Sequence, residues 1–283
     1  MKKIIILLLL STAYIFSNIK AVVSIAPEMT FVKAVGGEKV DLSLMVQPGN
    51  SPHTYEPKPS QMRAVARADL YFAIDVEFEH IWLPKFRSLN EKMQIVNLAE
   101  GVTKIEMAQR DHTHEGHDEH DGKDPHIWTS PANVKIIAQN IYKALSTIDP
   151  SNTKYYENNL NLFLDKIDNT DRQIKELLSK LKVSHKFMVF HPSWGYFAKD
   201  YNLEQIAVEV EGKSPKPREL VNLIGEAKKE RVTAIITQPE FSDASAKVIA
   251  NELHIPVVKI SPVSKNWSDN LIFMAKSIVG ENR

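Results

Sequence analysis

Five of the chain's ten histidines lie between residues 111 and 126, in the segment DHTHEGHDEHDGKDPH, where acidic residues are interleaved with them. Imidazole nitrogens bind zinc, copper and nickel, and carboxylate oxygens complete such sites where sulfur is absent. Four of these histidines stand in a polar stretch of low complexity, namely His112, His114, His117 and His120. They predict a flexible loop that captures metal weakly or senses it, although a solvated linker with incidental histidines has the same composition.

Three histidines each stand beside a proline in a turn: His53, His126 and His191. His53 follows a predicted strand, and His191 follows directly on the strand-like segment KFMVF. In parallel α/β folds, ligands gather at the carboxyl ends of the strands. We therefore expect His53 and His191 to face one crevice from opposite sides, and His126 to reach the same crevice from its loop.

The remaining histidines give a weaker signal. His80 comes shortly after the strand-like segment DLYFAID, but it has no proline neighbour. His185 and His254 stand alone. A single buried histidine is usually an ordinary hydrogen-bonding group, so we interpret His185 and His254 as structural.

Strand-like and helix-like segments alternate on both sides of one long helical pattern. This alternation over residues 22–150, and again over 183–283, predicts two α/β lobes with parallel sheets. In the first lobe, Ser130 and Pro131 have the residue types that cap and open a helix. The polar stretch 100–123 interrupts this lobe, and its composition predicts a mobile loop rich in histidine and aspartate.

Residues 151–182 contain the long helical pattern. Apolar residues recur there every three or four positions, and neither glycine nor proline interrupts them. About thirty residues at ~1.5 Å per residue would span roughly 45 Å, which suits a strut between two lobes; a coiled coil is the alternative. The predicted fold is therefore α/β, with two parallel-sheet lobes joined by one long rigid helix and a metal site in the inter-lobe cleft.

Composition and the amino-terminal segment indicate an exported protein. Hydrophobic residues make up 43% and charged residues 25%, and the net charge is zero, so nothing favours nucleic acid as a partner. A positive start, an apolar run and the small residue Ala21 predict a cleavable signal peptide over residues 1–21. Cysteine is absent, which excludes disulfides, thiolate metal sites and a lipid-modified cysteine. A free periplasmic protein fits these features.

Together the segments NSPHTYEPKPSQ, DPHIWTSPANV and FHPSWGYFAKDY resemble the metal-binding ABC-transporter substrate-binding proteins, in particular their zinc-specific branch. The three motifs keep the family's order and approximate spacing across nearly the whole mature chain. The resemblance implies two α/β lobes joined by one long helix, with zinc, the transported ligand, held between them. It further implies a monomer that delivers zinc to an inner-membrane permease powered by ATP hydrolysis.

By position, the resemblance assigns His53 and His126 as metal ligands from the first lobe and His191 as the ligand from the second. Manganese-preferring relatives tend to have glutamate where His191 stands, and imidazole in place of a hard oxygen favours zinc. Many relatives supply an aspartate as fourth ligand, but the corresponding segment KISPVSKNW has no acid before Asp269. The fourth position is therefore open between Glu240, which ends a predicted strand, and a water molecule.

Four other residues near these motifs could serve either at the metal site or in an ordinary structural role. Glu209 and Glu211 are weaker candidates for the fourth ligand, and solvated charges are the alternative. Trp128 and Trp194 closely follow two proposed ligands and could shield the site from water, or they could be ordinary core residues.

Other functions have less support in the sequence. A manganese or other divalent-metal receptor of the same family is the first alternative. A hydrolase with zinc on three histidines is the second, but HExxH, GxSxG and a glycine-rich phosphate loop are all absent from the sequence. We therefore predict no enzymatic activity. An adhesin role has no support from repeats or from an anchoring cysteine.

Overall fold

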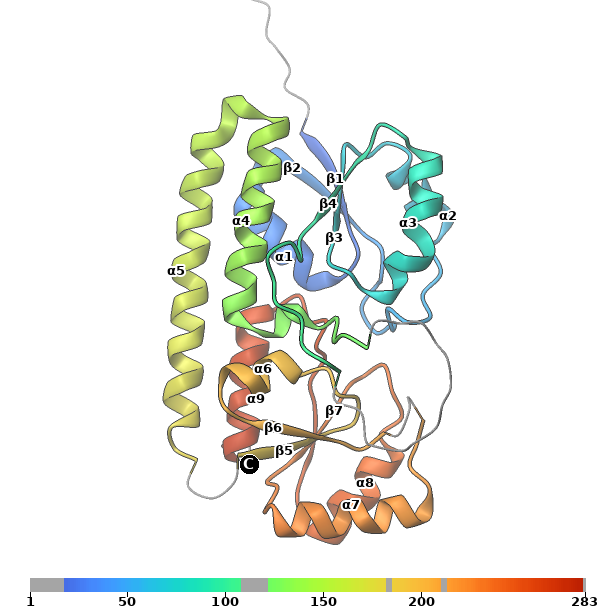
Figure 1. Ribbon diagram of the computed structural model, residues 1–283, viewed down its shortest axis with the longest axis vertical. Helices are drawn as coiled ribbons and strands as arrows, with labels where there is room; N and C mark the ends of the chain where they lie inside the picture. The colour runs from blue at the N-terminus through green and yellow to red at the C-terminus, as the bar shows by residue number, and fades with distance from the viewer. Residues whose placement is uncertain (1–17, 108–121, 182–184, 210–212, 282–283) are drawn as a thin grey trace, which may run out of the picture.

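A computed structural model describes residues 18–107, 122–181, 185–209 and 213–281. Two parallel sheets of four strands each form two lobes, with long helices along one side (Figure 1). The strand orders are β2-β1-β3-β4 and β6-β5-β7-β8, so the two sheets repeat one topology. The predicted fold class, two parallel-sheet α/β lobes joined by one long helix, is confirmed.

The first lobe is built on strands whose bounds are β1 (Ile19–Val23), β2 (Val40–Leu44), β3 (Leu70–Ala73) and β4 (Gln94–Asn97). Its helices are α1 (Ala26–Gly36), η1 (Gly37–Lys39), α2 (Pro59–Val65), α3 (Glu77–Leu89), η2 (Ile127–Thr129) and α4 (Pro131–Ile148). Helices α2 and α3 lie on one side of the sheet, and α1 and α4 lie on the other (Figure 1). Ser130 caps α4 as predicted, because its hydroxyl accepts a hydrogen bond from the backbone N–H of Asn133 at 3.1 Å.

Strand β1 bears on the predicted end of the signal peptide. It begins at Ile19 and pairs from there with β2, starting opposite Val40. Ala21 lies inside this strand and is only 1% exposed. Cleavage after Ala21 would therefore remove three of the five residues of a central strand of the first sheet.

Helix α3 and strand β4 were not assigned from the sequence. Phe78, Trp82 and Phe86 recur every four residues along α3, and each ring contacts the next, with centroids 6.4 and 6.0 Å apart. This aromatic spacing is a helical signal. Pro84, which stands inside the helix, is the residue type that argues against one.

Helix α5 (Thr153–Leu178) is the predicted strut, and it is 26 residues long. It follows η3 (Pro150–Asn152) and passes beside both lobes (Figure 1). It packs against α1 and α4 of the first lobe and against α9 (Trp267–Val279) of the second. One face is buried along most of its length, through Tyr156, Leu160, Phe163, Ile167 and Ile174. This packing makes α5 a strut fixed to both lobes.

The second lobe contains strands β5 (Lys186–Val189), β6 (Glu204–Ala207), β7 (Ile235–Thr237) and β8 (Val257–Lys259). Its helices before α9 are α6 (Gly195–Asp200), α7 (Pro217–Lys229) and α8 (Ala244–Leu253). Helices α7 and α8 cover one face of this sheet with a core of their own. The other face belongs to a core that continues through α5 and α9 into the first lobe. In the described part of the chain, no helix combines the length and apolar character needed to cross a membrane.

Candidate metal centre

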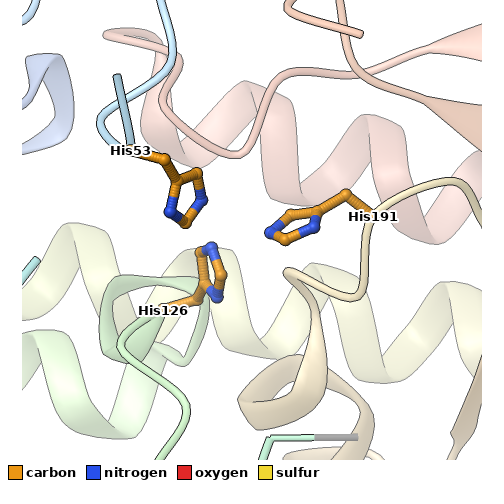
Figure 2. A group of neighbouring side chains, drawn as sticks. All are labelled: His53, His126 and His191. Atoms are coloured by element: carbon orange, nitrogen blue, oxygen red, sulfur yellow. The ribbon is translucent and has the colours of Figure 1, made fainter. Parts of the chain in front are cut away.

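The three proline-flanked histidines come together between the lobes. His53 lies on the loop after β2, His126 directly precedes η2, and His191 follows the end of β5. Each offers a ring nitrogen, and the three nitrogens lie within 4.8 Å of one another. The rings point toward a common centre (Figure 2). The fold thus brings His53, His126 and His191 together as predicted: His53 and His191 follow the carboxyl ends of strands in two different sheets, and His126 reaches them from its loop.

Burial differs among the three rings, and the pKa values of His53 and His126 are shifted in opposite directions. The side chains of His126 and His191 are 7% and 9% exposed, whereas that of His53 is 29% exposed. Burial lowers the pKa of His126 and outweighs the opposing effect of Asp124. The hydrogen bond with Glu77 raises the pKa of His53. His53 therefore carries a proton more readily than His126 does.

Each histidine has a carboxylate partner on its Nδ1 atom. The distances are 2.6 Å from His53 to Glu77, 2.8 Å from His126 to Asp124, and 2.7 Å from His191 to Glu209. When Nδ1–H donates to a carboxylate, the lone pair of the ring is on Nε2, which is then available to a metal ion. The Nε2 atom of His191 is buried and has no hydrogen-bond partner in the described structure. The three rings are thus held in the tautomer that a metal ligand needs.

Two of these carboxylates are buried and lack full hydrogen bonding. Asp124 is 0% and Glu209 is 7% exposed. Oδ2 of Asp124 and Oε2 of Glu209 have no hydrogen-bond partner within the described ranges. A buried negative charge is costly unless a cation compensates it. The arrangement therefore favours a divalent cation at the centre of the three imidazoles.

A small cavity lies beside the three rings. Its volume is about 30 Å³, and a cavity of roughly 10–15 Å³ already accommodates one water molecule. Its apolar wall includes Trp128, Phe241, Pro262 and Val263. There is room for one ion together with one small ligand.

The two tryptophans that follow the proposed ligands have different places. Trp128 lines the cavity, and its ring centroid is 5.4 Å from that of His126. Trp194 is fully buried and packs against Phe197. Trp128 is thus placed to shield the histidine cluster from water, whereas Trp194 is a residue of the hydrophobic core.

Glu240 also lines the cavity. Its Oε1 atom accepts a hydrogen bond from the hydroxyl of Ser261 at 2.8 Å, and its Oε2 atom is buried without a partner among the described residues. The cluster of ligand atoms lying within 4.8 Å of one another contains the three histidines and not Glu240. Glu209, the weaker candidate, hydrogen-bonds to His191 and so acts behind a ligand position.

Of the other residues singled out in the sequence, some lie outside the described ranges and others lie away from the histidine cluster. Five lie outside the described residues, namely Glu211, His112, His114, His117 and His120. Outside the cluster, His80 contacts Asp75 through Nε2 at 2.8 Å, and His254 ends α8 in the left-handed conformation.

Sequence reasoning missed the carboxylates that orient two rings. Asp124 stands two residues before His126 in DPH, a spacing that lets its Oδ1 accept bonds from both the backbone N–H and the Nδ1 of that histidine. Glu77 lies in the first turn of α3, the helix that was not assigned. The acid in DPH was a readable signal, whereas Glu77 could be placed only with the tertiary fold.

A family model described as the periplasmic component A of the zinc-uptake complex matches residues 21–279. The match covers both lobes and all three histidines. The chain belongs to this family. The resemblance inferred from the three sequence motifs is thereby confirmed, and the fold and the histidine cluster can be compared with those of other members.

Solved structures and sequence relatives of the zinc-uptake component A family agree with this membership. The crystal structure of ZnuA has a TM-score of 0.85 and 40% identity, covering 93% of this chain and 98% of that one. A ZnuA deletion mutant with zinc bound has a TM-score of 0.84 and 39% identity, covering 93% and 97%. The manganese ABC transporter substrate-binding lipoprotein PsaA of Streptococcus mitis is 29% identical over 237 residues, which is 80% of this chain and 74% of PsaA.

Proposed function

We propose that this chain is a periplasmic receptor that binds zinc through His53, His126 and His191 and delivers it to an ABC-type importer in the inner membrane. The observation that carries the proposal is the set of three carboxylate-oriented imidazoles, each of which offers a ring nitrogen within 4.8 Å of those of the other two. Three nitrogen donors of this kind are typical of zinc sites. The protein acts as a monomer that hands its cargo to the permease, and it catalyses no reaction.

Manganese is the second candidate cargo, because PsaA, a relative, is named for it. Manganese prefers carboxylate, carbonyl and water oxygens, whereas imidazole suits zinc. The described cluster presents three nitrogens and reserves Asp124 and Glu209 for orienting the rings. The donor set therefore favours zinc over manganese.

We propose that either Glu240 or a water molecule is the fourth ligand. Glu240 is favoured by its place on the cavity wall and by its unpartnered buried Oε2 atom. Water is favoured by the cavity volume of about 30 Å³, which leaves space for one small ligand beside the ion. Zinc X-ray absorption of the wild type and of Glu240→Ala separates the two, because only a carboxylate ligand would change the oxygen shell on substitution.

The histidine-rich segment is proposed as an accessory capture loop, with His112, His114, His117 and His120 binding zinc weakly. Its two ends are held together, because Glu106 and Lys123 form an antiparallel bridge and Met107 donates its backbone N–H to the carbonyl of Gly122. This stem leads directly into Asp124. Metal collected by the loop would thus arrive close to the histidine cluster.

Export through a cleavable signal peptide is part of the same proposal. The receptor role is tested by deleting the gene and growing the cells with limiting zinc. The wild-type gene should restore cellular zinc and growth, and the His191→Ala gene should not. Equal rescue by His191→Ala would overturn the proposal, and rescue by added manganese in place of zinc would support the second candidate.

A further inference from the structure

The second lobe contacts the carboxylate that orients His126. Asp124 is fully buried, and its Oδ1 atom accepts hydrogen bonds from both the backbone N–H and the Nδ1 of His126, each at 2.8 Å. The conformation of this short side chain therefore sets the orientation of the ring. A displacement of the Asp124 carboxylate would therefore also move the His126 ring.

Gly195, the first residue of α6, is packed against this carboxylate. A Cβ atom at Gly195 would lie 2.5 Å from Oδ2 of Asp124, which is far inside van der Waals contact, and 3.2 and 3.3 Å from side-chain atoms of Ile105 and Gln205. Gly195 is not among the residues with positive φ, so the backbone itself does not require glycine there. Glycine is needed for space, because α6 approaches the carboxylate of Asp124 this closely.

Tyr196, the next residue, holds the backbone of the same segment. Its hydroxyl donates to the carbonyl oxygen of Asp124 at 2.8 Å and accepts from the backbone N–H of Ile105 at 3.3 Å. Burial raises the pKa of Tyr196 to about 12, so the hydroxyl stays protonated and remains a donor. Two consecutive residues of the second lobe thus fix both the carboxylate and the main chain of Asp124.

The rest of the segment that carries His126 is bonded to the second lobe as well. The indole N–H of Trp128 donates to the carbonyl of Pro262 at 2.8 Å, and the indole N–H of Trp267 donates to the carbonyl of Trp128 at 2.7 Å. The hydroxyl of Ser130 donates to Asp200 at 2.5 Å. The segment is therefore attached to the second lobe, which also carries His191.

We propose that Gly195 and Tyr196 are positioning residues for zinc binding, through which the second lobe holds a first-lobe ligand, His126, in register with His191. This inference rests on the proposed zinc-binding function. In consequence, His126 and His191 form a preassembled pair, and His53, on its more exposed loop, is the ligand that completes the site. A side chain at Gly195 displaces Asp124 and turns the His126 ring away from the other two.

The test compares Gly195→Ala with Gly225→Ala, a matched control on α7 of the same lobe, where an added Cβ would meet no described atom within 4 Å. Zinc affinity should fall by ~10-fold or more in Gly195→Ala, the scale found when a group behind a metal ligand is disturbed. The control should bind as the wild type does. Cobalt(II) bound to Gly195→Ala should show altered d–d absorption, which reports ligand geometry and would not change through lost stability alone.

A double-mutant cycle with Asp124→Ala makes the test specific. Once the carboxylate is removed, Gly195→Ala should cause little further loss of zinc affinity, because its effect acts through Asp124. Additive losses, or a Gly195→Ala protein with wild-type affinity and cobalt spectrum, would overturn the inference while leaving the zinc function intact. If Gly195→Ala fails to fold, Tyr196→Phe must show the weakened binding and altered spectrum instead. Failure of the wild type to bind zinc would overturn both proposals.

Discussion

Substitution of Glu209 by glutamine tests whether the buried carboxylates stabilise bound metal through their charge. Glutamine keeps an oxygen that can accept from Nδ1–H of His191, but it removes the negative charge. Because Glu209 is only 7% exposed, solvent screens that charge weakly. Loss of such a partner costs ~10–100-fold in metal affinity, or about 1.4–2.7 kcal/mol.

Glu77→Gln is the matched control for this prediction. Glu77 contacts Nδ1 of His53 in the same way, but its side chain is 47% exposed. Water screens an exposed charge pair to roughly 0.2–1 kcal/mol, so the loss of zinc affinity should stay below about fivefold. The two substitutions are chemically identical and differ in burial.

The assay is competition calorimetry against a zinc chelator of known affinity, accompanied by thermal unfolding of the metal-free proteins. Metal-free Glu209→Gln should unfold at no lower temperature than the wild type, since it keeps the hydrogen bond and loses a buried charge. Reduced zinc affinity at unchanged stability would assign the effect to the site. Equal losses in Glu209→Gln and Glu77→Gln, or a loss below threefold in Glu209→Gln, would refute the electrostatic reasoning.

Three further predictions follow from the geometry. His191→Ala should weaken the tightest zinc site far more than deletion of residues 111–120, and equal losses would contradict the division into a primary and an accessory site. Because the pKa of His53 is raised above its ordinary value of 6.5, more than about half a proton should leave this ring on zinc binding at pH 6.5. Zinc affinity should accordingly decline as pH falls through that pKa. Calorimetry in buffers of different ionisation enthalpy measures the proton release, and binding without proton release would contradict this prediction. Intact mass of the exported protein should place its amino terminus before Ile19, because β1 starts there, and a terminus at Val22 would show that the sheet tolerates the shorter strand.

The sequence predicted the elements that have a single local cause. Ser130 and Pro131 lie at the start of α4, as their residue types predict, and the uninterrupted helical period predicted α5. Helix α3 was missed because Pro84 lies inside it, where a proline would ordinarily end a helix. Its stability there comes from tertiary packing around Phe86, which is fully buried.

The site was only partly readable, for a similar reason. His53, His126 and His191 could be chosen because each combines a ligand type with a turn at a strand or helix end. The orienting roles of Glu77 and Glu209 depend on distances between segments that are far apart in the chain. The close approach of Gly195 to Asp124 is likewise a property of the assembled lobes, and no local sequence pattern predicts it.

Calorimetric titration of the metal-stripped mature protein with zinc and, separately, with manganese tests directly whether the three imidazoles form a zinc-selective site. We expect one tight zinc site, weaker zinc sites that disappear when residues 111–120 are deleted, and little binding of manganese. Tight manganese binding would contradict the specificity assigned to the three imidazoles. Absence of a tight site for either ion would contradict the metal-receptor function itself.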